Sequence, residues 1–216
     1  MPIFRLPSRP WRPLLPLVAA VLLAGHPAAH ATIIGLNQII TPDLQPTGVL
    51  TTSAQFQDPA IGNRAELQFE LGLCDRLEVA AFQGVKPGEA IFSAEASVLA
   101  DGPHLLSIGA INLSTRGYGP QPVLEYGYYL KDDHFVAGAI DANRTAEPLL
   151  GYRHQFDDHW VFSADFQGGR ENSATLGVTY NFNDAFSVNP AVYFPNSGRH
   201  IPRAYIVFSW NKTLWK

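Results

Sequence analysis

Cysteine, long apolar runs and basic residues are all scarce in this chain. A single cysteine, Cys74, stands among 216 residues, so no intramolecular disulfide can form. After residue 31 no apolar stretch approaches the roughly 20 residues that a membrane-spanning helix needs. Three of the 15 basic residues precede residue 31, which leaves 12 against 19 acidic residues and a net charge of −7. That balance excludes nucleic-acid binding through bulk charge.

Catalytic and cofactor-binding motifs are missing as well. The chain has no nucleophile elbow, glycine-rich phosphate loop, His-Glu-x-x-His or Cys-x-x-Cys. We therefore expect neither a metal nor an organic cofactor.

The first 31 residues have the layout of a secretory signal peptide. Three arginines precede an apolar run from Leu14 to Ala24, and Ala29-His30-Ala31 follows with the small residues of a cleavage site. The run is about half the length of a spanning helix, which argues against a membrane anchor. We expect cleavage after Ala31 and export of the remaining chain.

Apolar and polar residues alternate through most of that exported part. In "RAELQFELGL", residues 64 to 73, Leu67, Phe69 and Leu71 share one face while Glu66 and Glu70 share the other. A period of two is the signature of a β-strand with one apolar side. The same pattern predicts twelve strands, near residues 47–57, 63–73, 76–85, 89–99, 104–112, 121–130, 134–142, 147–156, 159–168, 173–182, 185–194 and 202–210.

The connections between these strands alternate between two classes. Tight turns such as Cys74-Asp75 and Asn183-Asp184 alternate with longer loops such as "STRGYGPQ" (114–121) and "NRTA" (143–146). One end of the sheet therefore has short turns and the other has loops. Outer-membrane barrels have this asymmetry, with the short turns on the periplasmic side.

The last predicted strand, "AYIVFSW", places Ala204, Ile206, Phe208 and Trp210 on one face. With this ending the chain resembles bacterial outer-membrane β-barrels from residue 47 to residue 210. The resemblance implies an all-β fold, a closed antiparallel up-and-down transmembrane barrel of about 12 strands, located in the outer membrane. It also implies contact with outer-membrane lipids and lipopolysaccharide, and with the barrel-assembly machinery, which reads a terminal aromatic residue. Trp210 and Trp215 are both candidates for that residue.

Four regions follow from this reading: the signal peptide 1–31, an extended lead-in 32–46, the barrel 47–210 and a tail 211–216. Pro42 and Pro46 argue against a strand in the lead-in. Two positions remain open for it, inside the barrel mouth or in the periplasm.

The polar faces of the strands predict what lines the barrel. A water-filled path lined by acidic residues favours cations, whereas a small barrel can instead fill its interior with side chains. A small channel or export component and a closed structural barrel are therefore both open. The candidates for the lumen are Glu66, Glu70, Glu95, Glu125 and Asp165, with Arg153 as a counter-ion.

Basic residues gather at the predicted loops. A cationic rim there would bind the phosphate groups of lipopolysaccharide through charge-assisted contacts. The candidates are Arg64, Lys86, Arg116, Arg144, Arg170, Arg199 and Arg203.

Two alternatives belong to other classes of protein. A soluble periplasmic binding barrel would turn the apolar faces inward. A lipid-modifying enzyme would need a nucleophile beside a histidine at the loop end, where only His200, near Ser197, is available. We do not expect an enzyme.

The tripeptide Asp-Asp-His occurs twice, at 132–134 and 157–159, each time before an aromatic residue. Both copies lie at predicted short turns, where an Asp side chain hydrogen-bonds the turn backbone. We interpret them as hairpin turns, with His134 and His159 at the level of the lipid headgroups. An aromatic belt is expected at Tyr128, Phe156, Trp160, Phe182, Phe186, Phe194 and Trp210.

Overall fold

The computed structural model describes residues 35–85, 88–115, 119–142, 144–198 and 201–216, so the expected signal peptide lies outside the described residues. Within those ranges no helix is long and apolar enough to cross a membrane. Twelve strands make up the fold. They are β1 (Val49–Gln57), β2 (Ala65–Cys74), β3 (Leu77–Gly84), β4 (Ala90–Asp101), β5 (His104–Ser114), β6 (Gln121–Leu130), β7 (Asp133–Ala142), β8 (Thr145–Gln155), β9 (Trp160–Gln167), β10 (Ser173–Asn183), β11 (Phe186–Pro195) and β12 (Arg203–Thr213).

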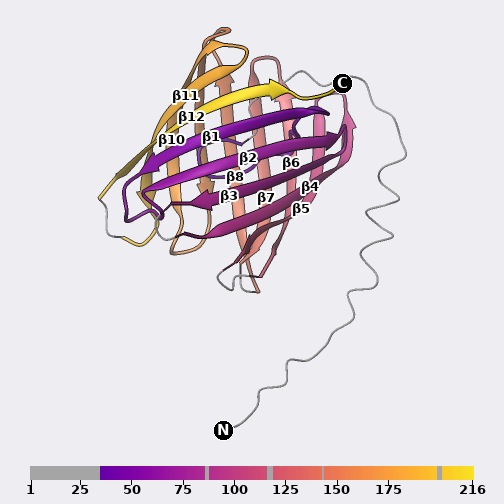
Figure 1. Cartoon of the computed structure of the whole chain (residues 1–216). Helices are drawn as coiled ribbons and strands as arrows, with labels where there is room; N and C mark the ends of the chain where they lie inside the picture. The colour runs from indigo at the N-terminus through magenta and orange to yellow at the C-terminus, as the bar shows by residue number, and fades with distance from the viewer. Residues whose placement is uncertain (1–34, 86–87, 116–118, 143, 199–200) are drawn as a thin grey trace.

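Each strand pairs antiparallel with its neighbours in the chain, and β1 pairs with β12, so the sheet closes into a barrel. Figure 1 shows this seam as the indigo first strand beside the yellow last strand. The ladder runs from Val49 opposite Thr213 to Gln57 opposite Tyr205. Because hydrocarbon offers no partner to backbone N–H and C=O groups, a sheet can cross a bilayer only when it closes. The predicted all-β, twelve-stranded, up-and-down barrel is confirmed.

The barrel is apolar outside, and its buried side chains are more often polar than apolar. Leu67 and Phe69 on β2 are 43% and 40% exposed, whereas Ser163 and Asp165 on β9 are buried inside. The expected alternation therefore holds with its apolar face outward. A soluble barrel has the reverse arrangement, with apolar side chains in its interior, so this finding argues against the soluble alternative.

Aromatic rings gather on the outside near the short-turn end. Trp160 lies 4.7 Å from Tyr180, which lies 4.9 Å from Phe182, and Phe182 lies 5.1 Å from Phe186 between ring centroids. Trp210 stands opposite Phe186 across the β11–β12 ladder. A row of aromatic rings such as this one suits the interface between hydrocarbon and water.

Strand boundaries differ from the sequence expectation by three residues or fewer, and two of these differences change a loop or the tail. The "NRTA" loop shrinks to residues 143–144, because Thr145 pairs with Ala142 and continues β8; Arg144 turns the chain with φ of 69°. The last strand does not end at Trp210, because Asn211, Lys212 and Thr213 pair with β1. The expected tail 211–216 therefore begins only after Thr213.

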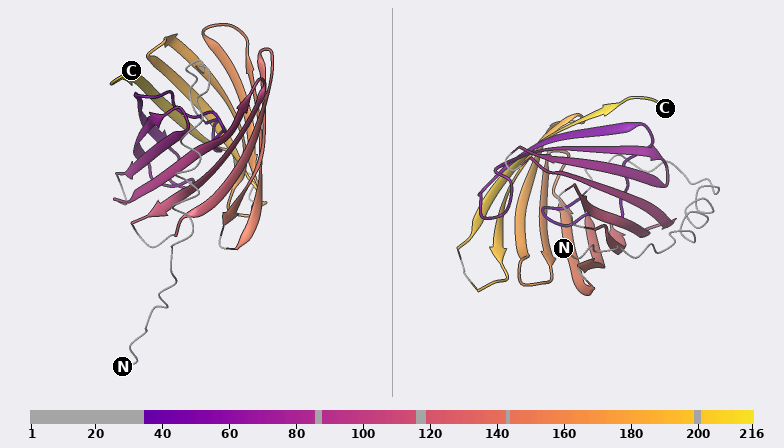
Figure 2. Two further views of the ribbon diagram at one scale, coloured as in Figure 1. Left: turned by 90° about the vertical axis from the view of Figure 1, so that its right-hand side faces the viewer. Right: turned by 60° about the horizontal axis from the view of Figure 1, so that its bottom comes forward.

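The chain before β1 runs inside the barrel. The right-hand view of Figure 2 looks into the ring of strands and shows this indigo segment within it. Ile39 is buried against Val123, Val136, Ile140 and Leu149, which point inward from β6, β7 and β8. Of the two positions left open for the lead-in, its residues 35–46 occupy the barrel interior.

Candidate pore lumen

The barrel interior retains a cavity of about 1100 Å³ beside the N-terminal segment. Its lining includes Gln55 and Asn112 near the long-loop end, and Asn183 and Asn211 at the short-turn end. Every second residue of a strand points inward, and the inward residues of every strand except β6 contribute to the wall. The hollow therefore reaches both ends of the barrel.

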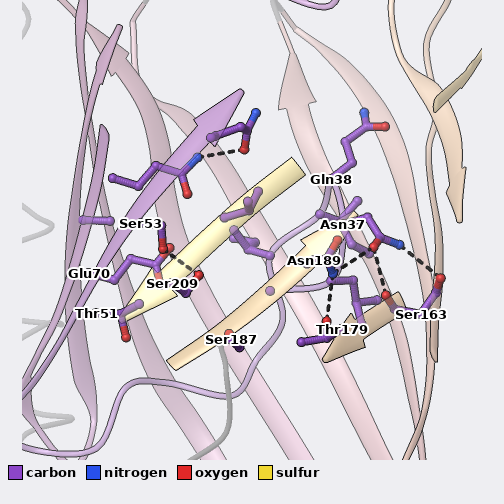
Figure 3. A pocket seen from close by; sticks show the side chains of 18 of the residues that line it. Asn37, Gln38, Thr51, Ser53, Glu70, Ser163, Thr179, Ser187, Asn189 and Ser209 are labelled. Atoms are coloured by element: carbon purple, nitrogen blue, oxygen red, sulfur yellow. Dashed lines mark hydrogen bonds between the residues drawn. The ribbon is translucent and has the colours of Figure 1, made fainter. Parts of the chain in front are cut away.

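Hydroxyl and amide groups cover much of this wall, and Figure 3 shows several of them. Ser53 and Ser209 are 2.9 Å apart between their hydroxyl oxygens across the β1–β12 seam. Asn189 donates to Thr179 at 2.9 Å, and Gln68 donates to Glu66 at 3.0 Å. Such groups can hydrogen-bond to water molecules in the lumen, so the wall is suited to a hydrated path.

Carboxylates concentrate on one side of the cavity. Glu66 and Glu70 come from β2, Glu78 from β3 and Glu95 from β4. Glu78 stands directly opposite Glu95 in the β3–β4 ladder. Like charges at opposed positions repel one another, and together these carboxyl groups make this side of the lumen acidic.

Of the six residues predicted to line the lumen, four line the cavity and two are buried. Glu66, Glu70, Glu95 and Arg153 line the cavity. Glu125 is fully buried in the wall, and the inward side of Gly138 is filled by its side chain. Asp165 is also buried and binds the N-terminal segment.

Arg153 does not act as a counter-ion to the wall carboxylates. Its guanidinium donates to the Tyr129 hydroxyl at 3.0 Å and lies 5.8 Å from the centroid of that ring. The Tyr129 hydroxyl in turn donates to Asp43 at 2.6 Å. The predicted pairing is corrected accordingly: Arg153 supports a contact with the N-terminal segment.

Asp165 is the first of two anchors for that segment. Its Oδ2 atom accepts the backbone N–H of Asn37 at 2.5 Å and that of Gln38 at 3.0 Å. The Asn37 side chain also accepts from the Ser163 hydroxyl at 2.9 Å, and the Asn37 carbonyl accepts from Tyr205 at 2.8 Å. Gln38 accepts from Ser173 and Thr175.

Asp43 is the second anchor, and here the carboxylate belongs to the segment. Besides the Tyr129 contact, its Oδ2 atom lies 3.3 Å from Nδ1 of His134. His134 stacks on Tyr129 with 4.1 Å between ring centroids. The histidine is 1% exposed, so the expectation that it sits at the headgroup level is wrong. It points into the barrel because neighbouring residues of a strand face opposite sides, and Phe135 is 44% exposed on the outside.

Four inward-facing glycines make room for the segment. A Cβ atom on Gly177 would stand 1.9 Å from the Asn37 side chain, and one on Gly151 would stand 2.2 Å from Leu36. A Cβ atom on Gly127 would stand 2.7 Å from Pro42, and one on Gly72 would stand 2.2 Å from the Pro46 carbonyl. Glycine within a strand often marks the close approach of another chain segment. These glycines are the sequence signal that could have revealed the buried segment.

The second Asp-Asp-His is a turn, as expected. Asp157 accepts the N–H groups of Trp160 and His159, each at 2.8 Å. In the first copy the turn is Lys131-Asp132, and Asp133 instead accepts from Tyr152 at 2.7 Å. No cluster of metal-ligating side chains occurs among the residues that the structure describes.

The predicted basic rim is described at four positions, all near the long-loop end. Arg64, Arg144 and Arg170 are exposed, and Arg203 pairs with Asp58 at 3.2 Å. The N–H of Ala60, and then Arg203, hold the pKa of Asp58 below its ordinary value. Lys86, Arg116 and Arg199 lie outside the described residues, as does His200, the candidate base of a lipid-modifying enzyme.

No family model and no curated protein matches this chain. Among solved structures it is similar to the KdgM porin, with a TM-score of 0.53 and 9% identity over 75% of this chain and 98% of that one. A KdgM porin in complex with disordered oligogalacturonate gives 0.52 and 10%, over 75% and 98%. The NanC porin gives 0.50 and 7%, over 76% and 98%. At these identities the likeness concerns the fold, which is that of an outer-membrane porin-like β-barrel.

Proposed function

We propose that the protein is a narrow outer-membrane channel for small polar solutes. The observation that carries this proposal is the cavity of about 1100 Å³ whose lining has polar side chains at both ends of the barrel. The apolar outer face and the porin-like fold support an outer-membrane location. The porin names of the similar structures favour passage over catalysis, and the described residues offer no observation for a lipid-modifying enzyme.

The charge of the lumen indicates which solutes would pass. Glu66, Glu70, Glu78 and Glu95 line the cavity, and Arg153 is engaged by Tyr129. A low-dielectric wall focuses this negative potential into the path. Cations and neutral solutes are favoured over anions. The oligogalacturonate named with the KdgM porin is a polyanion, which makes it an unfavourable solute for this lumen.

Conductance in planar lipid bilayers tests the proposal. The purified, folded full chain should give discrete current steps. Under a salt gradient, the reversal potential should have the sign of cation selectivity. Folded protein that inserts without any current would refute the channel, and an anion-selective reversal potential would refute the role of the carboxylates.

We also propose that the loop-end arginines bind lipopolysaccharide phosphate. Arg64, Arg144 and Arg170 are exposed at one end of the barrel, where guanidinium groups are free to form bidentate contacts with phosphate. Replacing all three by alanine should weaken co-purification with lipopolysaccharide, and high salt should do the same to the wild type. Unchanged co-purification of the folded triple variant would reject this partner.

A further inference from the structure

The N-terminal segment, residues 35–46, is bound to the barrel wall as a ligand is bound rather than as a strand. It forms no β-ladder within the described chain, and its first pairing is the isolated bridge between Thr47 and Gly72. Among the described residues, the backbone hydrogen bonds within Leu36 to Gln45 are limited to one, from the Leu36 N–H to the Ile39 carbonyl. Side chains therefore hold it, and side-chain contacts can be broken without opening the sheet.

Within the described residues, the segment is covalently joined to the barrel only at its junction with β1. That junction is well fixed, because Gly48 donates to the Gly72 carbonyl at 2.8 Å and accepts from Leu214 at 2.7 Å. Gln45 adds a contact to Glu78 at 2.7 Å. Beyond it the segment crosses the lumen to Asp165, so a release of its far part would pivot near Gln45.

The segment occupies the part of the interior that borders β6 to β10. Ile39 fills the space between Val136 and Leu149, and Asn37 reaches the β9–β10 wall. Residues 35–40 also border the remaining cavity. Their removal would join the space they occupy to that cavity and widen the path.

Two anchors of like chemistry hold this arrangement. Each is a carboxylate that accepts short hydrogen bonds: Asp165 from the backbone of Asn37 and Gln38, and Asp43 from Tyr129. Charged acceptors make stronger bonds than neutral ones, so much of the segment's retention depends on these two groups.

We propose that residues 35–46 are a tethered plug that narrows the channel without blocking it, held in place by Asp43 and Asp165. This inference rests on the proposed channel function. Release of both anchors lets the segment withdraw from the β6–β10 side while the barrel stays folded. Tethering gives the segment a high effective concentration, so the bound, narrowed form predominates in the wild type.

Cysteine accessibility tests the plug without any reference to conduction. In a Cys74→Ser background, Thr41→Cys places a thiol at a position with 0% exposure. A water-soluble maleimide should label it slowly in the otherwise wild-type chain. With Asp43→Asn and Asp165→Asn added, labelling should be at least tenfold faster. The matched control neutralises two exposed acids outside the lumen, Asp101→Asn and Glu171→Gln, and should leave the rate unchanged. Equal rates in all three folded proteins would overturn the plug.

A reversible lock gives the conductance test. The Cβ position of residue 177 is 2.8 Å from Cγ of Asn37, so Asn37→Cys with Gly177→Cys is placed to form a disulfide. In the Cys74→Ser, Asp43→Asn, Asp165→Asn background, the reduced protein should conduct severalfold more than the wild type. Oxidation should return it to the wild-type level, and a redox-insensitive conductance would refute the gating role.

The two readouts separate the proposals. Faster labelling in a protein that never conducts would retain the releasable segment and reject the channel. Steady conduction with no change in labelling or in response to the lock would retain the channel and reject the plug. Heat-modifiable migration on gels, which folded barrels show, confirms in each case that the barrel is intact. Should the double variant not fold, the single variants Asp43→Asn and Asp165→Asn carry the same labelling test.

Discussion

Asp165 on β9 accepts the backbone N–H of Asn37 at 2.5 Å, across 128 residues of chain. The contact joins a carboxylate of the barrel wall to a segment that the strands do not include. It leaves one side of the lumen filled and the other hollow. The geometry of the remaining path thus depends on where twelve residues before the barrel are bound.

Neutralising the lumen carboxylates should reduce cation selectivity. Glu66→Gln and Glu70→Gln remove two charges from one wall of the cavity, so the reversal potential under a salt gradient should move toward zero. Glu171→Gln, on an exposed loop, is the control and should not shift it. A reversal potential that stays at the wild-type value in the double variant would place the selective charges elsewhere.

A side chain at Gly177 should expel the segment from its place. In Gly177→Ala the added methyl would stand 1.9 Å from the Asn37 side chain and 2.9 Å from Ala191, so Asn37 must leave its contacts with β9. The same labelling of Thr41→Cys should become faster. Gly119→Ala, whose Cβ meets nothing within 4 Å, is the matched control, and a slow rate in both would contradict the steric argument.

Truncation of Ile39 should destabilise the folded protein. Ile39 is 4% exposed within the apolar cluster inside the barrel, and replacing a buried Ile by Ala costs about 2–5 kcal/mol. The midpoint of heat-modifiable migration should fall. Leu150→Ala removes similar bulk from the lipid-facing side of β8, where Leu150 is 53% exposed, and should lower the midpoint less.

The turn at Asp157 should depend on pH in a defined direction. The N–H groups of Trp160 and then His159 lower the pKa of this carboxyl from its ordinary value of 3.8. A lowered folded-state pKa means that the stabilisation is present above the ordinary value and is lost as the pH falls through the folded one. Asp157→Asn keeps an acceptor oxygen, as Asn183 does in another turn, and should remove this acid sensitivity.

Thermal scans of the wild type, Asp157→Asn and Asp157→Ala from pH 5 down to pH 2 would measure the effect. Asp157→Ala should be less stable than Asp157→Asn throughout, because it leaves two backbone N–H groups without their acceptor. If both variants kept the acid sensitivity of the wild type, the titrating group would be another residue.

The strands and their inward and outward faces could be predicted because they depend on neighbouring residues only. Leu67 and Phe69 alternate with Glu66 and Glu70, and a pleated strand must separate the two sets. The turn at Asp157 is equally local, since the carboxylate caps N–H groups two and three residues away. His134 was misplaced because it was assigned to the turn, whereas it is the second residue of β7 and faces inward, opposite to Phe135.

The sequence by itself determined a closed barrel with an apolar outside, because period-two alternation, strand length and connection length are all written in adjacent residues. Only the tertiary structure decided that residues 35–46 enter the lumen and that Asp165 and Arg153 help to hold them there. The contact between Asp165 and Asn37 spans 128 residues and that between Tyr129 and Asp43 spans 86, and the segment also depends on space left by glycines of separate strands. The glycines mark that space in the sequence, but which segment fills it is decided only once the sheet has closed.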